Sequence, residues 1–193
     1  MTKNILYLHG FLSSPKSVKA QLTKEHIEIH HPELDILIPQ LPNHPEQTAD
    51  VLQQLLEHYG SSLIGVVGSS LGGYLATWVS QQLAIPGVLI NPAAYPYVLL
   101  QDYLGWHKHP YTGDEFEVTP NFNEHLKYFD VPTPSQLPLW LLLQTEDETL
   151  NYREAVDKYQ GCQMTIEEGG DHAFQGYERF LPQIVEFFQA RLD

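Results

Sequence analysis

The sequence predicts a three-layer α/β fold, with a mostly parallel sheet of about six strands and helices on both faces. Short apolar runs alternate with amphipathic segments along most of the chain, which is the pattern of parallel β-α-β units. Hydrophobic residues make up 42% of the chain, enough to build a buried core. The length of 193 residues suits one domain, so we expect residues 1–193 to fold as a single unit.

Six apolar runs are expected to form the strands of this sheet. Each run is short and is bounded by turn residues or by the start of a helical pattern. In chain order, the predicted strands are Ile5–Leu8, Asp35–Ile38, Leu63–Val67, Val88–Ile90, Leu139–Leu143 and Gln163–Ile166.

Helical periodicity fills the segments between these runs. The first helix is expected to open at Ser14, as its cap, with Pro15 in the first turn. Gly60 is expected to end the second helix. The remaining predicted helices, in chain order, are Pro45–Tyr59, Leu71–Leu83, Tyr152–Tyr159 and Tyr177–Ala190.

The segment 91–137 does not follow this alternation. It is rich in proline and aromatic residues, and a connection of this length is typical of a lid or a binding loop. We expect an insertion after Ile90 that shapes a substrate pocket, because exposure of its large aromatic side chains would be unfavourable. The alternative is an excursion that only covers the edge of the sheet. The predicted pocket residues are Leu12, Tyr95, Tyr97, Tyr103 and Trp106.

The stretch GVVGSSLGG contains the pattern G-x-S-x-G, which is typical of a nucleophilic serine on a sharp strand-to-helix turn. Only the frame from Gly68 to Gly72 fits, and it selects Ser70 over Ser69. Backbones pass closely at such a turn, so the positions two before and two after the serine must lack side chains. The alternative is a structural or phosphate-binding turn, but neither common glycine-rich nucleotide motif is present.

A serine nucleophile needs a general base, and His172 has the right position in the chain. In folds with this turn the order is serine, acid, histidine, with the histidine on a loop after the last strand. His172 lies in such a loop, GGDHAF, whose two glycines allow the ring to reach Ser70. The alternative is a loop histidine whose role is structural and not catalytic.

The acid is expected after the fifth strand, where the sequence reads TEDET. We choose Asp147, which would hold the tautomer of His172 and stabilise its charged form. Glu146 and Glu148 are expected to be solvated loop charges. Asp171 is expected to stabilise its own loop.

Two backbone amides are expected to stabilise the oxyanion of an acyl-transfer reaction. One belongs to Leu71, directly after the nucleophile, and the other to Phe11 in the loop LHGFLSS, with Leu12 next. Gly10 allows this loop to approach the reacting carbonyl, and His9 is expected to be a structural turn residue.

Several of these stretches together resemble the YqiA-like esterases, a family within the α/β-hydrolases. The resemblance extends over nearly the whole chain, including HPYTG in the insertion; the stretches are YLHGFLSSPKS, GSSLGGYLA, INPA, DYLG, HPYTGDEF, QTEDETLNY and GGDHAF. It implies the α/β-hydrolase fold and serine-dependent cleavage of carboxylic esters or thioesters, including acyl-CoA, by Ser70, Asp147 and His172. The chain departs from the family at Glu146, where a glycine is expected.

Charge and composition limit the partners. The net charge of −14 disfavours nucleic acid and anionic lipid surfaces. The single cysteine, Cys162, excludes an intramolecular disulfide and paired-cysteine metal motifs, and the chain has no apolar run long enough for a membrane span or a signal peptide. We therefore expect a cytoplasmic protein that needs no metal or organic cofactor.

The sequence thus predicts a serine hydrolase that acts on a small acyl ester or thioester. The alternative is a non-catalytic binding or scaffold protein on the same fold. Lys16, Lys19 and Lys24 fall on the predicted first helix and would attract a CoA phosphate, although an ordinary solvated helix face explains them better. Acyl-chain length, physiological substrate and oligomeric state are not predicted.

Overall fold

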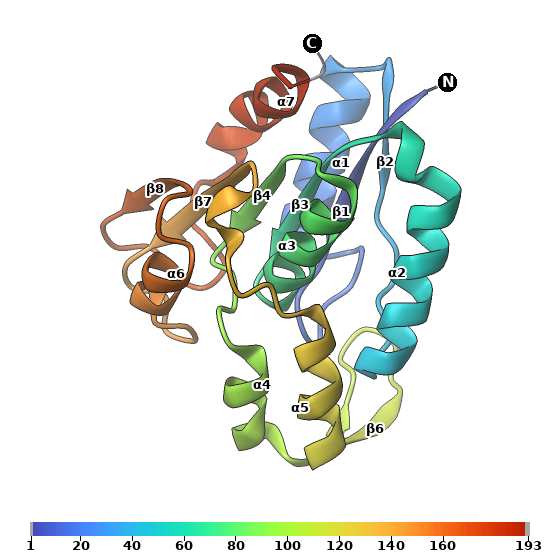
Figure 1. Cartoon of the computed structure of the whole chain (residues 1–193), viewed down its shortest axis with the longest axis vertical. Helices are drawn as coiled ribbons and strands as arrows, with labels where there is room; N and C mark the ends of the chain where they lie inside the picture. Colours follow the sequence, from blue (N-terminus) through green and yellow to red (C-terminus); the bar gives the residue numbers. More distant parts are fainter. Residues whose placement is uncertain (1, 192–193) are drawn as a thin grey trace.

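Six parallel strands form the central sheet of the computed structural model, which describes residues 2–191 (Figure 1). Their spatial order is β2-β1-β3-β4-β7-β8, so the direction of strand addition changes between β1 and β3. A ligand crevice in such a sheet forms at this switch, beyond the carboxyl ends of the strands. The strands are β1 (Lys3–Leu8), β2 (Leu34–Leu37), β3 (Leu63–Ser69), β4 (Gly87–Ile90), β7 (Leu139–Gln144) and β8 (Gln163–Glu167). All six predicted strands are present, and their ends differ from the predicted ends by at most two residues.

Helices cover both faces of the sheet, as Figure 1 shows. Ile5 and Tyr7 of β1 face α1 (Val18–His30) and α7 (Leu181–Gln189), whereas Leu6 and Leu8 face the opposite layer. That layer consists of α2 (Pro45–Tyr59), α3 (Leu71–Leu83) and α6 (Tyr152–Lys158), with the short 3-10 helix η1 (Gly60–Ser62) after α2. Alternating side chains thus give each face its own apolar core.

Two helices begin later than the sequence predicted. Ser14 does not cap α1, because its hydroxyl accepts the Lys16 amide at 3.0 Å and its carbonyl accepts the Ser17 amide at 3.0 Å. These bonds form a separate turn, and the helix starts at Val18. The last helix is preceded by a 3-10 turn, η5 (Tyr177–Phe180), and α7 starts at Leu181. Within residues 2–191, no helix is both long and apolar enough to cross a membrane.

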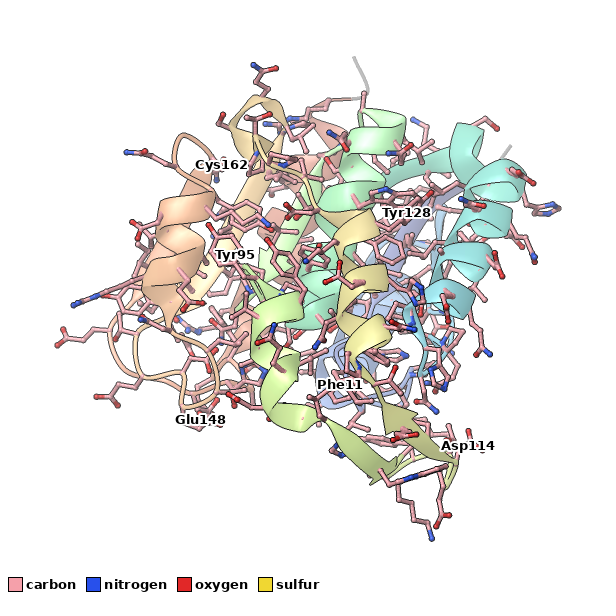
Figure 2. The ribbon with its side chains drawn as sticks, turned by 60° about the horizontal axis from the view of Figure 1, so that its bottom comes forward. Phe11, Tyr95, Asp114, Tyr128, Glu148 and Cys162 are labelled. Carbon is pink, nitrogen blue, oxygen red and sulfur yellow. The ribbon has the colours of Figure 1, made fainter. Side chains whose placement is uncertain are left out.

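The segment 91–137 forms a small assembly of its own beside the carboxyl ends of the strands. Leu100, Phe116, Val118, Phe122 and Leu126 form its apolar cluster, which packs against Phe11, Leu12 and Leu71. Figure 2 shows α4 and α5 side by side, with the hairpin that carries Asp114 projecting beyond them. Its elements are α4 (Pro96–Leu99), η2 (Leu100–Tyr103), the antiparallel pair β5 (Gly105–Lys108) and β6 (Glu115–Val118), α5 (Pro120–Leu126), η3 (Lys127–Phe129) and η4 (Pro134–Gln136).

One lysine ties the two ends of this segment to α6. Lys158 Nζ donates to the Ala94 carbonyl at 2.8 Å and to Asp130 Oδ1 at 2.6 Å. The ammonium group is buried near the rings of Tyr74 and Tyr95, at 5.1 and 4.9 Å from their centroids. Burial lowers the pKa of Lys158, and the Asp130 carboxylate opposes that shift. The start and the end of the insertion are therefore held by the same charged group.

Candidate active site

Ser70 lies on a strained turn between β3 and α3. Its φ of 55° and ψ of −120° are rare for a residue with a side chain and cost about 1–3 kcal/mol. The end of β4 enforces this conformation, because the Ser70 amide donates to the Ile90 carbonyl at 3.0 Å. The Ser70 carbonyl in turn accepts the Ala93 amide at 3.0 Å. The hydroxyl group is thus presented at the carboxyl end of the sheet.

The glycines on either side of Ser70 are required by steric contact. A Cβ at Gly68 would lie 2.1 Å from the Gly72 carbonyl oxygen, and one at Gly72 would lie 2.0 Å from the Leu8 carbonyl oxygen. Both obstacles are backbone atoms, which cannot move aside as a flexible side chain would. Ser69, by contrast, is buried as the last residue of β3. The predicted frame and the predicted serine therefore agree with the geometry of the turn.

Three predicted residues form a continuous chain of hydrogen bonds. His172 Nε2 lies 3.1 Å from Ser70 Oγ, and His172 Nδ1 lies 2.8 Å from Asp147 Oδ2. A carboxylate only accepts hydrogen bonds, so Nδ1 carries the proton and Nε2 is free to accept the serine proton. The Asp147 side chain is only 2% exposed, and its second oxygen accepts the Thr149 and Leu150 amides at 2.9 and 2.8 Å. The arrangement can make Ser70 nucleophilic and orient the imidazole.

The loops of Asp147 and His172 are joined by more than this one bond. The Glu148 carboxylate accepts the backbone amide of His172 at 2.9 Å, so this residue is more than the solvated charge that was expected. Asp171 stabilises its own loop, as predicted, since its carboxylate accepts a hydrogen bond from the Gln175 side chain. Glu146 is exposed, and its amide donates to the Gly169 carbonyl at 3.1 Å.

The loop after β1 passes close to Ser70. A Cβ at Gly10 would lie 3.2 Å from Ser70 Cβ, which shows how near the backbone comes. Within residues 2–191, neither the Phe11 nor the Leu71 amide donates to a protein acceptor, and both residues line the cleft described below. His9 is outside the relay: its Nε2 accepts the Leu41 amide at 3.0 Å, and Nδ1 donates to the Gly10 carbonyl at 2.9 Å. Burial lowers the pKa of His9 and keeps it neutral, in agreement with a structural residue.

A cleft of about 190 Å³ opens at Ser70 and His172. Its walls are mostly apolar and come from the loop after β1, the start of α3 and the first part of the insertion. Of the predicted pocket residues, Leu12 and Tyr103 line it. The other lining residues are Phe11, Leu71, Ala93, Pro96, Leu99, Leu100 and Thr149.

Three residues predicted for the pocket lie elsewhere. The Tyr95 ring covers Lys158, and the Tyr97 ring packs edge-on against Tyr74 at 6.4 Å between centroids. Trp106 is 71% exposed, because the alternation of β5 turns it outward while His107 faces the cluster. Sequence composition identified the aromatic insertion but not which of its side chains would point inward.

Two buried polar residues of the site were not predicted at all. Asn91 directly follows β4, Gln144 is the last residue of β7, and each side chain hydrogen bonds to the loop of His172. The available signal is a lone amide residue at the end of an apolar strand.

Among residues 2–191, no group of three or more His, Cys, Asp or Glu side chains is placed to hold a metal ion.

None of the three lysines considered as a phosphate-binding group lines the cleft. Lys19 Nζ donates at 2.8 Å to the carbonyl of Ala173, the residue after His172. Lys24 Nζ lies 3.6 Å from Glu28 Oε1. Lys16 is exposed before the start of α1. The three do not form a cluster that faces the cleft.

A family model described as "Uncharacterised protein family (UPF0227)" matches residues 4–189, and this is the family of the YqiA-like proteins. Among solved structures, Est1E from Butyrivibrio proteoclasticus with bound ferulic acid is 14% identical, with a TM-score of 0.74 over 98% of this chain and 89% of that chain. Mouse α/β hydrolase domain-containing protein 10 is 16% identical, with a TM-score of 0.72 over 100% and 92%. A monoacylglycerol lipase from Paleococcus ferrophilus is 14% identical, with a TM-score of 0.70 over 97% and 94%. These likenesses identify the predicted α/β-hydrolase fold.

Proposed function

This chain belongs to the uncharacterised protein family UPF0227, and we propose that it is a serine hydrolase that cleaves carboxylic esters or thioesters. The observation that carries the proposal is the hydrogen-bonded series Ser70–His172–Asp147 at the apolar cleft. The fold supports this proposal only in general terms, since structural neighbours include proteins named as an esterase and as a monoacylglycerol lipase.

The proposed reaction uses these three residues and two backbone amides. Ser70 Oγ attacks the acyl carbonyl carbon while its proton passes to His172 Nε2, and Asp147 stabilises the resulting imidazolium. The amides of Phe11 and Leu71 stabilise the negative charge on the carbonyl oxygen. His172 then protonates the departing alcohol or thiol, which leaves an acyl-enzyme. His172 then accepts a proton from water, which attacks the acyl carbon. As the bond to Ser70 Oγ breaks, His172 returns this proton to Oγ, and the acid and free Ser70 are released.

The acyl group is proposed to lie in the apolar cleft, which suits a short to medium chain. Tyr103 forms part of the cleft wall, and its ring packs edge-on against the Phe11 ring, with 5.9 Å between the ring centroids. The segment 91–137 therefore acts as a pocket-forming insertion on a single hydrolase domain.

Simple esters are proposed as better substrates than acyl-CoA. A CoA leaving group carries several phosphate charges, and the chain has a net charge of −14. Lys19, the predicted lysine nearest the His172 loop, is engaged with a carbonyl. Hydrolysis of butyryl-CoA should be slower than that of p-nitrophenyl butyrate and should gain more from added salt, which screens the repulsion. Faster turnover of butyryl-CoA that falls with salt would instead indicate a phosphate-binding surface.

The decisive experiment compares Ser70→Ala with Ser69→Ala. The wild type and Ser69→Ala should react with a fluorophosphonate probe, while Ser70→Ala should not react and should lose about 10⁴-fold or more in kcat on p-nitrophenyl butyrate. An unlabelled wild type without ester turnover would overturn the proposal and favour a binding protein on this fold. An equal loss of kcat in Ser69→Ala and Ser70→Ala would show that the nucleophilic serine is misassigned.

A further inference from the structure

Gln144 connects the strand before Asp147 to the loop that carries His172. It is the last residue of β7, and it is 3% exposed. Its Oε1 accepts the Asp171 amide at 3.2 Å and the Gln175 amide at 2.8 Å. Its Nε2 donates to the Gln175 carbonyl and to Glu167 Oε2, both at 2.9 Å. A primary amide offers two donors and two acceptor sites, so all four are used.

The loop is shaped around this amide. A Cβ at Gly170 would lie 2.0 Å from Gln144 Oε1, so only glycine leaves room for the side chain. Gly169, Gly170 and Gly176 all have positive φ values, which glycine adopts without penalty. Such a loop has many conformations open to it, and the bonds to Gln144 select one.

Asn91, the residue directly after β4, joins the same network. It is also 3% exposed and has a φ of 39°. Its Oδ1 accepts the Gln144 backbone amide at 3.0 Å, and its Nδ2 donates to the Asp171 carbonyl at 3.0 Å. One amide side chain thus fixes the end of β7 and the residue before His172.

We propose that Gln144 and Asn91 are positioning residues for His172, an inference that rests on the proposed hydrolase function. They act through the backbone on both sides of the imidazole, at positions 171 and 175. Leaving a buried amide or carbonyl unpaired is costly, so the loop is held in the conformation that brings Nε2 to Ser70. A displacement of about 1 Å in such an arrangement costs about 100-fold in rate.

The test variant is Gln144→Met, which keeps the length of the side chain and removes its hydrogen bonds. The matched control is Asn4→Leu, because Asn4 is also a buried amide, with Nδ2 donating to Ser62 Oγ at 2.8 Å. Asn4 lies at the amino end of β1, whereas the candidate site lies at the carboxyl ends of the strands. Free energies of unfolding measured for both variants correct for a general loss of stability.

Two readouts separate positioning from stability. Gln144→Met should lower kcat on p-nitrophenyl butyrate by about 10- to 100-fold with KM within about twofold, while Asn4→Leu keeps kcat within about twofold. In proton NMR of the protein without substrate, the downfield signal of the His172 Nδ1–H bound to Asp147 should be broadened or lost only in Gln144→Met. Unchanged kcat and an unchanged signal in Gln144→Met would overturn the proposal.

The two readouts also distinguish this inference from the proposed function. If the wild type shows no ester turnover, the hydrolase proposal fails, and loss of the NMR signal in Gln144→Met still supports the positioning role, whereas its retention overturns it. Should Gln144→Met not fold, Asn91→Gly provides the same test, because glycine suits the φ of 39° and only the side-chain bonds are lost. We expect a smaller decrease of kcat, about 5- to 10-fold, and a signal that stays sharp would contradict the inference.

Discussion

The loops at the carboxyl ends of the sheet and the insertion 91–137 meet at the same cleft but are held in different ways. The loops of Ser70, Asp147 and His172 are short and are fixed by backbone hydrogen bonds, glycines and buried amides. The insertion has its own apolar cluster, and Lys158 fixes it at its ends. The proposed catalytic residues therefore lie in loops held by the ends of the strands. The shape of the cleft depends in addition on the insertion, which packs around its own apolar cluster.

Backbone strain is concentrated after the strands. Four residues with side chains and positive φ lie in the loops after strands of the central sheet: Leu12, Ser70, Asn91 and Phe174. Asn91 is also the first residue of the insertion, and in the rest of that segment the positive φ values belong to Gly105 and Gly113. The other such residue within 2–191, Ala84, is the C-cap of α3. Strained conformations persist where the surroundings enforce them.

The largest expected effect compares one glycine from each region. Gly72→Ala should destabilise the protein by more than about 3 kcal/mol, because the new Cβ meets the Leu8 carbonyl oxygen at 2.0 Å. Gly113→Ala should cost about 1–2 kcal/mol, since a Cβ there meets nothing within 4 Å and only the φ of 78° is unfavourable. Urea unfolding measures both. Equal losses would show that the turn at Ser70 is no more constrained than the hairpin.

The next effect tests the attachment of the insertion. Lys158→Met leaves Asp130 without its buried partner and should cost about 2–3 kcal/mol in thermal or urea unfolding. Lys127→Met is the control, because its bond to Glu124 is exposed and such pairs contribute little. An unchanged free energy of unfolding in Lys158→Met would mean that the apolar cluster alone holds the insertion.

A smaller effect concerns the selectivity of the cleft. Tyr103→Ala removes a wall and should raise kcat/KM for p-nitrophenyl octanoate relative to the butyrate about 5- to 10-fold. Trp106→Ala should leave this ratio unchanged, since that side chain faces solvent. The same shift in both variants would contradict the proposed acyl pocket.

The smallest effect is a pH dependence from His9. Burial lowers the pKa of His9 in the folded protein, so the unfolded chain binds its proton more readily near the ordinary value of 6.5. The stability due to neutral His9 is complete well above pH 6.5 and decreases as the pH falls through and below that value. Unfolding free energies of the wild type and His9→Gln at pH 8 and pH 6 isolate this contribution, because the other histidines are common to both proteins. A difference that does not change with pH would show that His9 takes up its proton equally in both states.

From the sequence alone, the strands could be predicted to within two residues, together with the bounds of the helices Pro45–Tyr59 and Leu71–Leu83 and the frame that selects Ser70. These features depend on neighbours along the chain: apolar periodicity and the steric demands of one tight turn. Asp147 and His172 were predicted from the serine–acid–histidine order typical of this turn and from their loops after the last two strands.

Other side-chain contacts of the site could be read only from the structure. The amides of Gln144 and Asn91 and the carboxylate of Glu148 reach partners far away in sequence, so no local pattern reports those bonds. The insertion was recognised by its length and composition, but the β5–β6 pairing and the outward direction of Trp106 depend on what its short elements pack against. Local periodicity specifies an element, whereas contacts through space specify where its side chains point.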